Sequence, residues 1–256
     1  MIPKRIHYCW FGRNEKSKLT LKCIKNWKRK CPDYEIIEWN EDNFDILSCP
    51  LYVRQAYEEK KWAFVTDYVR LKVVYTHGGI YLDTDVELRK SLDVLLTQEA
   101  YFGFENKEYV ASGLGFGAVK GLDVLQEMMD EYNDKSFVLP DGSYDLTPCP
   151  QRNTEVLLKH GLIQNNSRQI LDANILILPS DILCPIDYCT GNKKITRDTI
   201  SIHHFAASWH TEEEKKVYKE KRKLNRKHNF IHFPNRMLMR VLGESKYEKF
   251  KLWLKN

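Results

Sequence analysis

The chain has 256 residues, a hydrophobic content of 43% and a formal net charge of +5. This length and apolar content allow a full buried core, which excludes intrinsic disorder and fits one domain or a domain with an appendage. The positive charge is mild and concentrated after Lys215, which argues against nucleic acid as a partner and favours a local anionic contact.

Short runs of strand-forming residues alternate with helical patterns, which favours an α/β domain with a largely parallel sheet. We expect strands at 2–12, 34–40, 79–88, 100–105, 113–119, 173–178 and 199–204, and helices at 19–30, 52–77, 121–132 and 153–160. From residue 211 onward the sequence is charged and helical without strand signals. The pattern therefore predicts a main domain at 1–210 and a basic helical appendage at 211–256.

The chain shows no sign of a membrane span or of structural metal bound by thiolates. No apolar run approaches the roughly eighteen residues that a span needs, and the N-terminal MIPKRIHYCWFG lacks the apolar core of a signal sequence. The seven cysteines have no paired CxxC spacing, so we expect reduced thiols rather than disulfides or a zinc site. A cytoplasmic location is expected.

Two aspartates, Asp83 and Asp85, follow the apolar run Ile80-Tyr81-Leu82. On a strand, residues two apart point to the same face, so both carboxylates are expected to point in one direction. Two carboxylates so close repel each other unless a cation lies between them. Mg²⁺ and Mn²⁺ take oxygen ligands and bridge carboxylates to substrate phosphates, so the pattern indicates a metal-bound phosphorylated donor.

The preceding helix adds a second charged pair. Asp67 and Arg70 are three residues apart and share a helical face, within the otherwise apolar segment WAFVTDYVRLKVVYTHGG. Such a pair is either a helix-surface ion pair or a partly buried pair that needs polar partners such as sugar hydroxyls or phosphates. The apolar surroundings favour the buried alternative.

The segment FVTDYVRLKVVYTHGGIYLDTDVEL, together with the N-terminal IPKRIHYCWFG, resembles the DXD-containing sugar-transferase region of glycosyltransferase family 32. The same residues are similar to the catalytic domain of the large clostridial glucosylating toxins. This resemblance implies a GT-A-type fold, with a Rossmann-like mixed sheet flanked by helices. It also implies a nucleotide-sugar donor, a divalent cation (Mn²⁺ or Mg²⁺) and retention of the anomeric configuration.

The resemblance also assigns roles. The implied catalytic residues are Asp67, Arg70, Asp83 and Asp85. Trp10 matches the tryptophan that stacks on the donor's base. Asp67 and Arg70 match the pair that holds the sugar hydroxyls, and Tyr81 matches the residue that contacts the ribose.

Further positions complete the implied metal and donor sites. Asp83 matches a position at the ribose and sugar, and Asp85 the direct metal ligand. In TISIHHFAASW, a strand that turns Ile200 and Ile202 to the core directs His203 away from it, which makes His203 a better metal or phosphate contact than His204. Ser208 and Trp209 resemble the loop that closes over the leaving diphosphate.

The residues leave the mechanism and the exact activity open. Retention can proceed by attack from the face of departure, or by double displacement through a carboxylate such as Glu105 or Asp145. A metal-dependent nucleotidyl- or phosphotransferase is disfavoured because neither GxxxxGK[ST] nor GxGxxG occurs. A non-catalytic sugar- or nucleotide-binding module on the same fold stays an alternative.

The resemblance favours a UDP-linked hexose as donor, with the sugar unassigned, and a polysaccharide or lipid-linked glycan as acceptor, with a protein acceptor as the alternative. The appendage carries the basic residues Lys215, Lys216, Lys219, Lys221, Arg222, Lys223, Arg226 and Lys227, followed by FIHFPNRMLMRVLG. This segment either packs on the main domain or attaches the enzyme to the anionic inner face of the plasma membrane.

Overall fold

A computed structural model describes residues 1–206, 216–217, 220 and 223–225. The chain divides into two compact units, Met1–Ile186 with Lys193–Trp209, and Asp187–Asn192 with His210–Asn256. The predicted boundary at residues 210 and 211 lies outside the described residues and stays a prediction.

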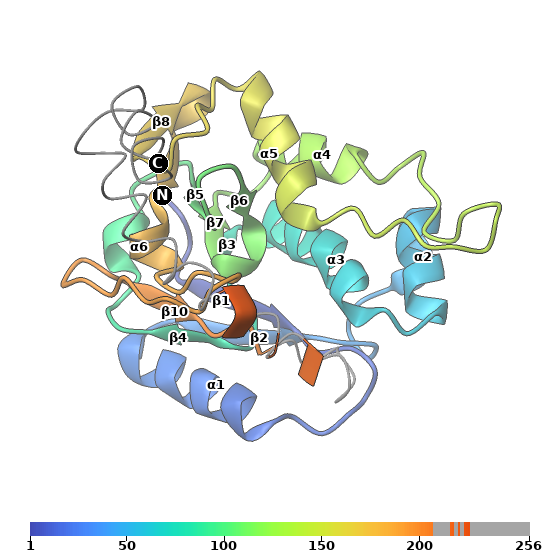
Figure 1. Ribbon diagram of the computed structural model, residues 1–256, viewed down its shortest axis with the longest axis horizontal. Helices are drawn as coiled ribbons and strands as arrows, with labels where there is room; N and C mark the ends of the chain where they lie inside the picture. Colours follow the sequence, from blue (N-terminus) through green and yellow to red (C-terminus); the bar gives the residue numbers. More distant parts are fainter. Residues whose placement is uncertain (207–215, 218–219, 221–222, 226–256) are drawn as a thin grey trace, which may run out of the picture. The chain divides into compact units, whose positions relative to one another are not determined.

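The first unit is built on a mixed sheet with strand order β2-β1-β3-β7-β5-β9-β8, and β6 pairs with β5 (Figure 1). The strands are β1 (Arg5–Cys9), β2 (Glu35–Trp39), β3 (Gly79–Tyr81), β5 (Ala100–Phe104), β6 (Val110–Ala111), β7 (Phe116–Ala118), β8 (Gln169–Leu171) and β9 (Ile175–Leu178). The strands β2, β1 and β3 are parallel, whereas β7 is antiparallel to both β3 and β5. The expected mixed α/β sheet is therefore confirmed, and the narrower expectation of a largely parallel sheet is wrong.

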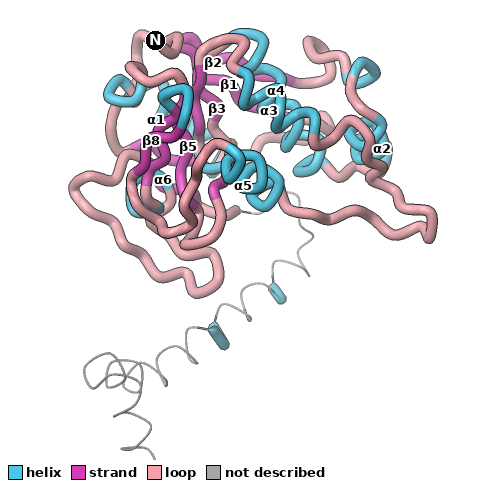
Figure 2. The backbone as a smooth tube through the Cα atoms, turned by 90° about the horizontal axis from the view of Figure 1, so that it is seen from above, coloured by secondary structure: helices cyan, strands magenta, loops and turns pink. Residues whose placement is uncertain are grey.

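Helices cover both faces of this sheet. They are α1 (Lys18–Lys30), α2 (Leu51–Glu58), α3 (Trp62–His77), α4 (Asp123–Asp130), α5 (Cys149–Lys159) and α6 (Ser180–Leu183). Two separate apolar cores result, because successive strand residues alternate between the faces. On β5, Phe102 and Phe104 join the core beneath α2 to α5, while Tyr101 joins the core that contains Trp27 of α1. Figure 2 shows α3 and α4 running beside one another, as Figure 1 does.

A second, two-stranded sheet pairs β4 (Val86–Leu88) with β10 (Ser201–His203) in antiparallel register. The indole nitrogen of Trp27 donates a hydrogen bond to the carbonyl of Val86 over 2.7 Å, which fixes α1 against β4. This small sheet brings the end of the first unit, about 115 residues later in the chain, beside the turn that follows β3.

Several predicted elements need correction. The expected helix 52–77 is two helices, because Lys60 takes a left-handed φ of 56° between α2 and α3. The expected strand 79–88 is also divided, into β3 and β4. The strand β8 was not predicted, and α5 begins at Cys149 rather than Asn153, since Pro148 and Pro150 suit the start of a helix.

The expectations for cysteines and membrane spans can be compared with the described residues. All seven cysteines are free thiols, and six of them are buried. Among the described helices, none has the length and apolar character that crossing a bilayer requires.

Within the second unit, Asp187 accepts hydrogen bonds from the amide and the hydroxyl of Thr190, and Asn225 donates to the carbonyl of Cys189. The described residues 216, 217, 220 and 223–225 are helical, as the sequence predicts.

Candidate active site

The two aspartates of the DXD motif lie in a turn between β3 and β4. The amide of Val86 donates to the carbonyl of Asp83 over 3.0 Å and closes this turn. The prediction that both aspartates lie on one strand is wrong, because β3 pairs in the large sheet and β4 in the small one. The chain has to turn between the two sheets, and the turn still brings both carboxylates together.

His203 completes a cluster with these aspartates. Its Nε2 lies 3.1 Å from Asp85 Oδ1 and 4.0 Å from Asp83 Oδ2. One potential ligand atom from each of the three residues lies within 4.8 Å of the other two. Two carboxylate oxygens and one imidazole nitrogen suit Mn²⁺, and the carboxylates alone also suit Mg²⁺. The residues therefore fit the divalent cation that the sequence predicts.

His204, the neighbouring histidine, has a different partner. Its Nε2 lies 3.0 Å from Glu87 Oε2, and Lys22 lies 3.6 Å from the same oxygen. His203, not His204, therefore joins the aspartate cluster, as the strand argument predicts. Ser201, on the same strand, is buried and donates to the carbonyl of Leu183.

Arg70 links the DXD turn to helix α3. Its Nη2 lies 3.2 Å from Asp67 Oδ1 and 3.2 Å from Asp83 Oδ1, and its Nε donates to the carbonyl of Thr66. The side chains of Arg70 and Asp67 are only 6% and 14% exposed, which excludes a helix-surface ion pair. The guanidinium also lies 5.1 Å above the ring of Tyr81.

The carboxylates of the site titrate in different directions. Burial raises the pKa of Asp67 to about 6, and it also raises the pKa of Asp83 although Arg70 opposes the shift. Burial acts in the same direction on Asp85, but the charge and hydrogen bond of His203 and the amide of Ala206 lower its pKa to about 2. Asp85 in turn raises the pKa of His203 well above its ordinary value, against the effect of burial.

The predicted donor-binding residues lie at the same edge of the sheet where they are described. Trp10 and Leu82 directly follow the parallel neighbours β1 and β3, where ligands bind in open α/β sheets. Trp10 is half-buried; its indole donates to the carbonyl of Asn14, and Lys16 lies 5.6 Å from its ring centre. Tyr81 is buried beneath Arg70. Ser208 and Trp209 lie outside the described residues.

The structure also brings three residues to the site that the sequence did not indicate. Gly113 packs on the Asp83–Arg70 ion pair, and Cys149 at the start of α5 lies 3.9 Å from Arg70 Nη1. Ala206 donates its amide proton to Asp85 Oδ2 over 2.7 Å. These are contacts of backbone or of small side chains across 30 or more positions of sequence, so no local pattern could reveal them.

Asp145, one of the two candidate nucleophiles, is already engaged. Its Oδ2 accepts from Arg152 over 2.6 Å, and its Oδ1 accepts from the amide and hydroxyl of Thr147. These hydrogen bonds lower its pKa although burial opposes the shift. The guanidinium of Arg152 lies 5.3 Å from the ring centre of Tyr52 and 5.2 Å from that of Tyr132. This arrangement holds the loop before α5 in place and argues against Asp145 as a nucleophile.

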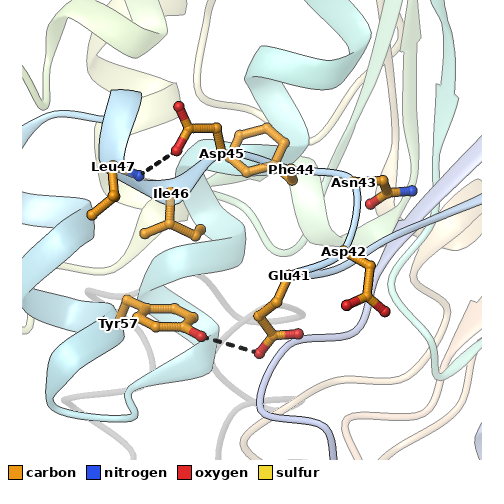
Figure 3. A pocket seen from close by; sticks show the side chains of 8 residues that line it. All are labelled: Glu41, Asp42, Asn43, Phe44, Asp45, Ile46, Leu47 and Tyr57. Atoms are coloured by element: carbon orange, nitrogen blue, oxygen red, sulfur yellow. Dashed lines mark hydrogen bonds between the residues drawn. The ribbon is translucent and has the colours of Figure 1, made fainter.

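A surface pocket of about 600 Å³ lies elsewhere, lined by residues 41–47 and Tyr57 (Figure 3). Its carboxylates have local roles: Glu41 accepts from the Tyr57 hydroxyl, and Asp45 caps the turn at Leu47. None of the lining residues is basic, so this pocket does not suit a nucleoside diphosphate.

Comparisons with known proteins agree with this site. Residues 17–102 match the family described as "Glycosyltransferase sugar-binding region containing DXD motif". Inositol phosphoceramide mannosyltransferase 3 of Schizosaccharomyces pombe is 34% identical over 132 residues, which cover 50% of this chain and 36% of that protein. Subversion of eukaryotic traffic protein A of Legionella pneumophila is 27% identical over 111 residues, covering 33% of this chain and 17% of that protein.

The chain thus spans little more than a third of the length of one relative and less of the other. Among solved structures, the PaToxG glycosyltransferase aligns with a TM-score of 0.48 and 18% identity over 62% of this chain and 69% of that chain. The galactosyltransferase LgtC, solved with donor and acceptor sugar analogues, aligns with a TM-score of 0.44 and 13% identity over 86% of this chain and 95% of that chain.

The matched region 17–102 contains Asp67, Arg70, Asp83 and Asp85, which the structure brings together at one edge of the sheet. This part of the chain is similar to the sugar-binding region of glycosyltransferases that contain a DXD motif.

Proposed function

We propose that the protein is a retaining, metal-dependent glycosyltransferase that moves a hexose from a UDP-linked donor to a polysaccharide or lipid-linked glycan. The observation that carries this proposal is the Asp83, Asp85 and His203 cluster beside the buried Arg70–Asp67 pair. A metal-ligand cluster next to a hydrogen-bonding charged pair is what a nucleotide sugar needs, because its diphosphate and its hexose are adjacent.

Asp83, Asp85 and His203 would hold Mn²⁺ or Mg²⁺. Such an ion supplies Lewis-acid stabilisation of the charge that develops on the departing diphosphate. The imidazole ligand favours Mn²⁺ over Mg²⁺, because Mg²⁺ prefers oxygen ligands alone.

The remaining residues bind and orient the donor. Arg70 and Asp67 are pre-organised for hydroxyl groups, because the guanidinium is held by two carboxylates and by the carbonyl of Thr66. Trp10 offers an aromatic ring for base stacking at the end of β1. With Asp145 held by Arg152 and Thr147, attack from the face of departure is favoured over double displacement through that residue.

The acceptor is proposed from the relatives. The named activity of the Schizosaccharomyces pombe relative is mannosyl transfer to a phosphoceramide lipid, which supports a lipid-linked acceptor and adds mannose to the hexoses to be tested. A protein acceptor is the second candidate, favoured by the resemblance to the glucosylating toxins.

We also propose that the enzyme works in the cytoplasm at the inner face of the plasma membrane. The support is the basic composition of residues 215–227 and the apolar segment that follows. Most of these residues lie outside the described part of the structure. Each basic residue near an anionic surface contributes about 1 kcal/mol, so half of them would hold the enzyme at the membrane.

Donor hydrolysis by the purified protein tests the proposed activity. We expect one UDP-hexose, in a panel that includes GDP-mannose, to be hydrolysed with Mn²⁺ and to remain intact with EDTA. Tight binding of a nucleotide sugar with no turnover, with or without glycan, lipid and protein acceptors, would instead indicate a non-catalytic binding module.

A sedimentation experiment tests the membrane proposal. The chain should sediment with vesicles of anionic lipid at low salt and be released as salt rises. A variant with Lys221, Arg222, Lys223, Arg226 and Lys227 changed to Gln should lose sedimentation and retain donor hydrolysis. Equal sedimentation of both proteins with neutral and anionic vesicles would contradict a membrane role.

A further inference from the structure

The turn Ser112–Leu114, between β6 and β7, lies against the charged pair of the site. A Cβ atom added to Gly113 would lie 2.5 Å from Asp83 Oδ2 and 2.8 Å from Arg70 Nη1. Real Cβ contacts are longer than this, so any side chain at this position would displace the ion pair. Gly113 has no left-handed φ, so glycine is needed here for close approach and not for backbone conformation.

The start of α5 contacts the same guanidinium. Cys149 Sγ lies 3.9 Å from Arg70 Nη1 and 3.2 Å from Ser112 Oγ. The thiol also donates to Asn153 Oδ1 over 3.2 Å, and this oxygen accepts from the amide of Ser112. Cys149, Ser112 and Asn153 are all buried. These contacts connect the turn Ser112–Leu114, the start of α5 and Arg70 in one polar cluster.

We propose that Gly113 and Cys149 are positioning residues, which hold Arg70 and Asp83 in the geometry that the donor requires. The expected effect on catalysis rests on the proposed transferase function. The expected effect on the position of Arg70 does not. Arg70 forms ion pairs with both Asp67 and Asp83, each over 3.2 Å. A small displacement of its guanidinium therefore weakens one of the two ion pairs. Asp83 also belongs to the cluster that would hold the metal, so a displacement of its carboxylate would also weaken metal binding.

A role of Cys149 as nucleophile is disfavoured by its surroundings. Burial raises the pKa of the thiol to about 12, so it is protonated at neutral pH. Its position against Arg70 and Ser112 is that of a packing and hydrogen-bonding group. A serine there retains the hydrogen-bonding capacity, whereas a valine of similar size does not.

The first test compares Gly113→Ala with Gly121→Ala. A Cβ at Gly121 would meet nothing within 4 Å, and its φ of +74° makes alanine strained there, so this control destabilises the fold without touching the site. We expect Gly113→Ala to weaken Mn²⁺ binding in calorimetric titration by about tenfold and to lower kcat for donor hydrolysis by about 10- to 100-fold. The control should retain both values with a lower melting temperature. Equal losses in both variants, or none in Gly113→Ala, would overturn the inference.

The second test compares Cys149→Ser with Cys149→Val. The serine variant should retain most of kcat, and the valine variant should lose at least about tenfold in kcat with little change in the KM of the donor, because the lost contact orients rather than recruits it. Equal kcat values for serine and valine would contradict the role of the thiol.

A readout that needs no donor separates this inference from the proposed function. The Nε–H of Arg70 donates to the carbonyl of Thr66 and should give a distinct NMR signal, identified by its loss in Arg70→Lys. This signal should shift in Gly113→Ala and Cys149→Val but not in Gly121→Ala. An unchanged signal in the first two variants overturns the positioning role even in an active enzyme. A wild type with the expected shifts but no donor hydrolysis would refute the transferase function alone.

Discussion

The candidate active site has two halves that stabilise buried carboxylates in different ways. In the sugar half, Asp67 and Asp83 both contact Arg70, and burial keeps the pKa of both carboxyls above the ordinary value. In the metal half, Asp85 has His203 at 3.1 Å and accepts the amide proton of Ala206, and its pKa is lowered to about 2. Asp83 and Asp85 are two positions apart, so the partners and not the sequence position decide their electrostatics.

This difference suits the two halves to the roles proposed for them, sugar recognition and metal binding. A carboxylate with a low pKa is fully ionised at neutral pH and suits a direct cation ligand. Carboxylates that share one guanidinium are held rigidly and have oxygens left for hydroxyl groups. The two halves meet at Asp83, which touches Arg70 and belongs to the metal cluster.

The largest effect is expected from a substitution in the metal half. Asp85→Asn removes the charged ligand and should abolish detectable donor hydrolysis, while the protein stays folded with a lower melting temperature, because His203 and the amide of Ala206 stabilise the charge of Asp85. Initial rates with saturating Mn²⁺ and the melting temperature measure the two outcomes. Retained metal-dependent turnover in this variant would contradict the assignment of Asp85.

Asp83→Asn should have the next largest effect. The amide retains an oxygen for Arg70 but loses the charge that balances the guanidinium, so we expect kcat to fall by about 100-fold, with residual metal-dependent activity. Steady-state kinetics over a range of Mn²⁺ concentrations would show this. A variant with wild-type kcat would show that the sugar half does not depend on this ion pair.

The pH dependence of stability should identify Asp67. A carboxyl whose folded pKa of about 6 exceeds its ordinary value near 3.8 stabilises the fold below pH 3.8, and that stability is lost as pH rises to about 6. The free energy of unfolding of the wild type, relative to Asp67→Asn, should therefore fall from pH 4 to 6, by at most about 3 kcal/mol. Denaturant unfolding of both proteins at several pH values measures this difference in the free energy of unfolding. A difference that rises with pH would contradict a raised pKa of the buried Asp67 carboxyl.

Trp10→Ala should weaken UDP binding by about 1 to 3 kcal/mol if the ring stacks on the base. Calorimetric titration with UDP and Mn²⁺ gives the affinity, and the melting temperature of the metal-free protein gives the control. A purely structural Trp10 would produce the opposite result, a large loss of thermal stability with unchanged affinity in the folded protein.

The smallest effect is expected from His204→Gln. His204 contacts Glu87 outside the aspartate cluster, so donor hydrolysis should change by less than about threefold, close to what the loss of one partly exposed polar contact allows. The matched substitution His203→Gln should lower Mn²⁺ affinity strongly. If His204→Gln lowered Mn²⁺ affinity and His203→Gln did not, His204 and not His203 would be the metal ligand.

Much of the metal half could be predicted from local sequence. Asp83 and Asp85 lie in one short motif, and the alternation of Ile200 and Ile202 pointed to His203. The predicted cluster of the two aspartates with His203 is present although the aspartates do not lie on one strand, because the turn between the two sheets also brings both carboxylates together. The division of the segment 79–88 depends on β10, which pairs with β4 from about 115 positions away, and no local pattern shows such a pairing.

The support of the sugar half could not be predicted. Asp67 and Arg70 were visible as a helical pair in an apolar segment. Gly113 and Cys149 contact Arg70 only because the turn before β7 and the start of α5 both lie against its side chain. Glycine and cysteine are common in buried positions, so their residue types alone indicate packing rather than a contact with a charged pair.

Calorimetric titration of the metal-free protein with Mn²⁺, in the presence of UDP, tests the central assignment most directly. The wild type and His204→Gln should bind one Mn²⁺ per chain with similar affinity, Asp83→Asn should bind it more weakly, and Asp85→Asn should show no binding. Mn²⁺ binding by Asp85→Asn with the affinity of the wild type would contradict the account.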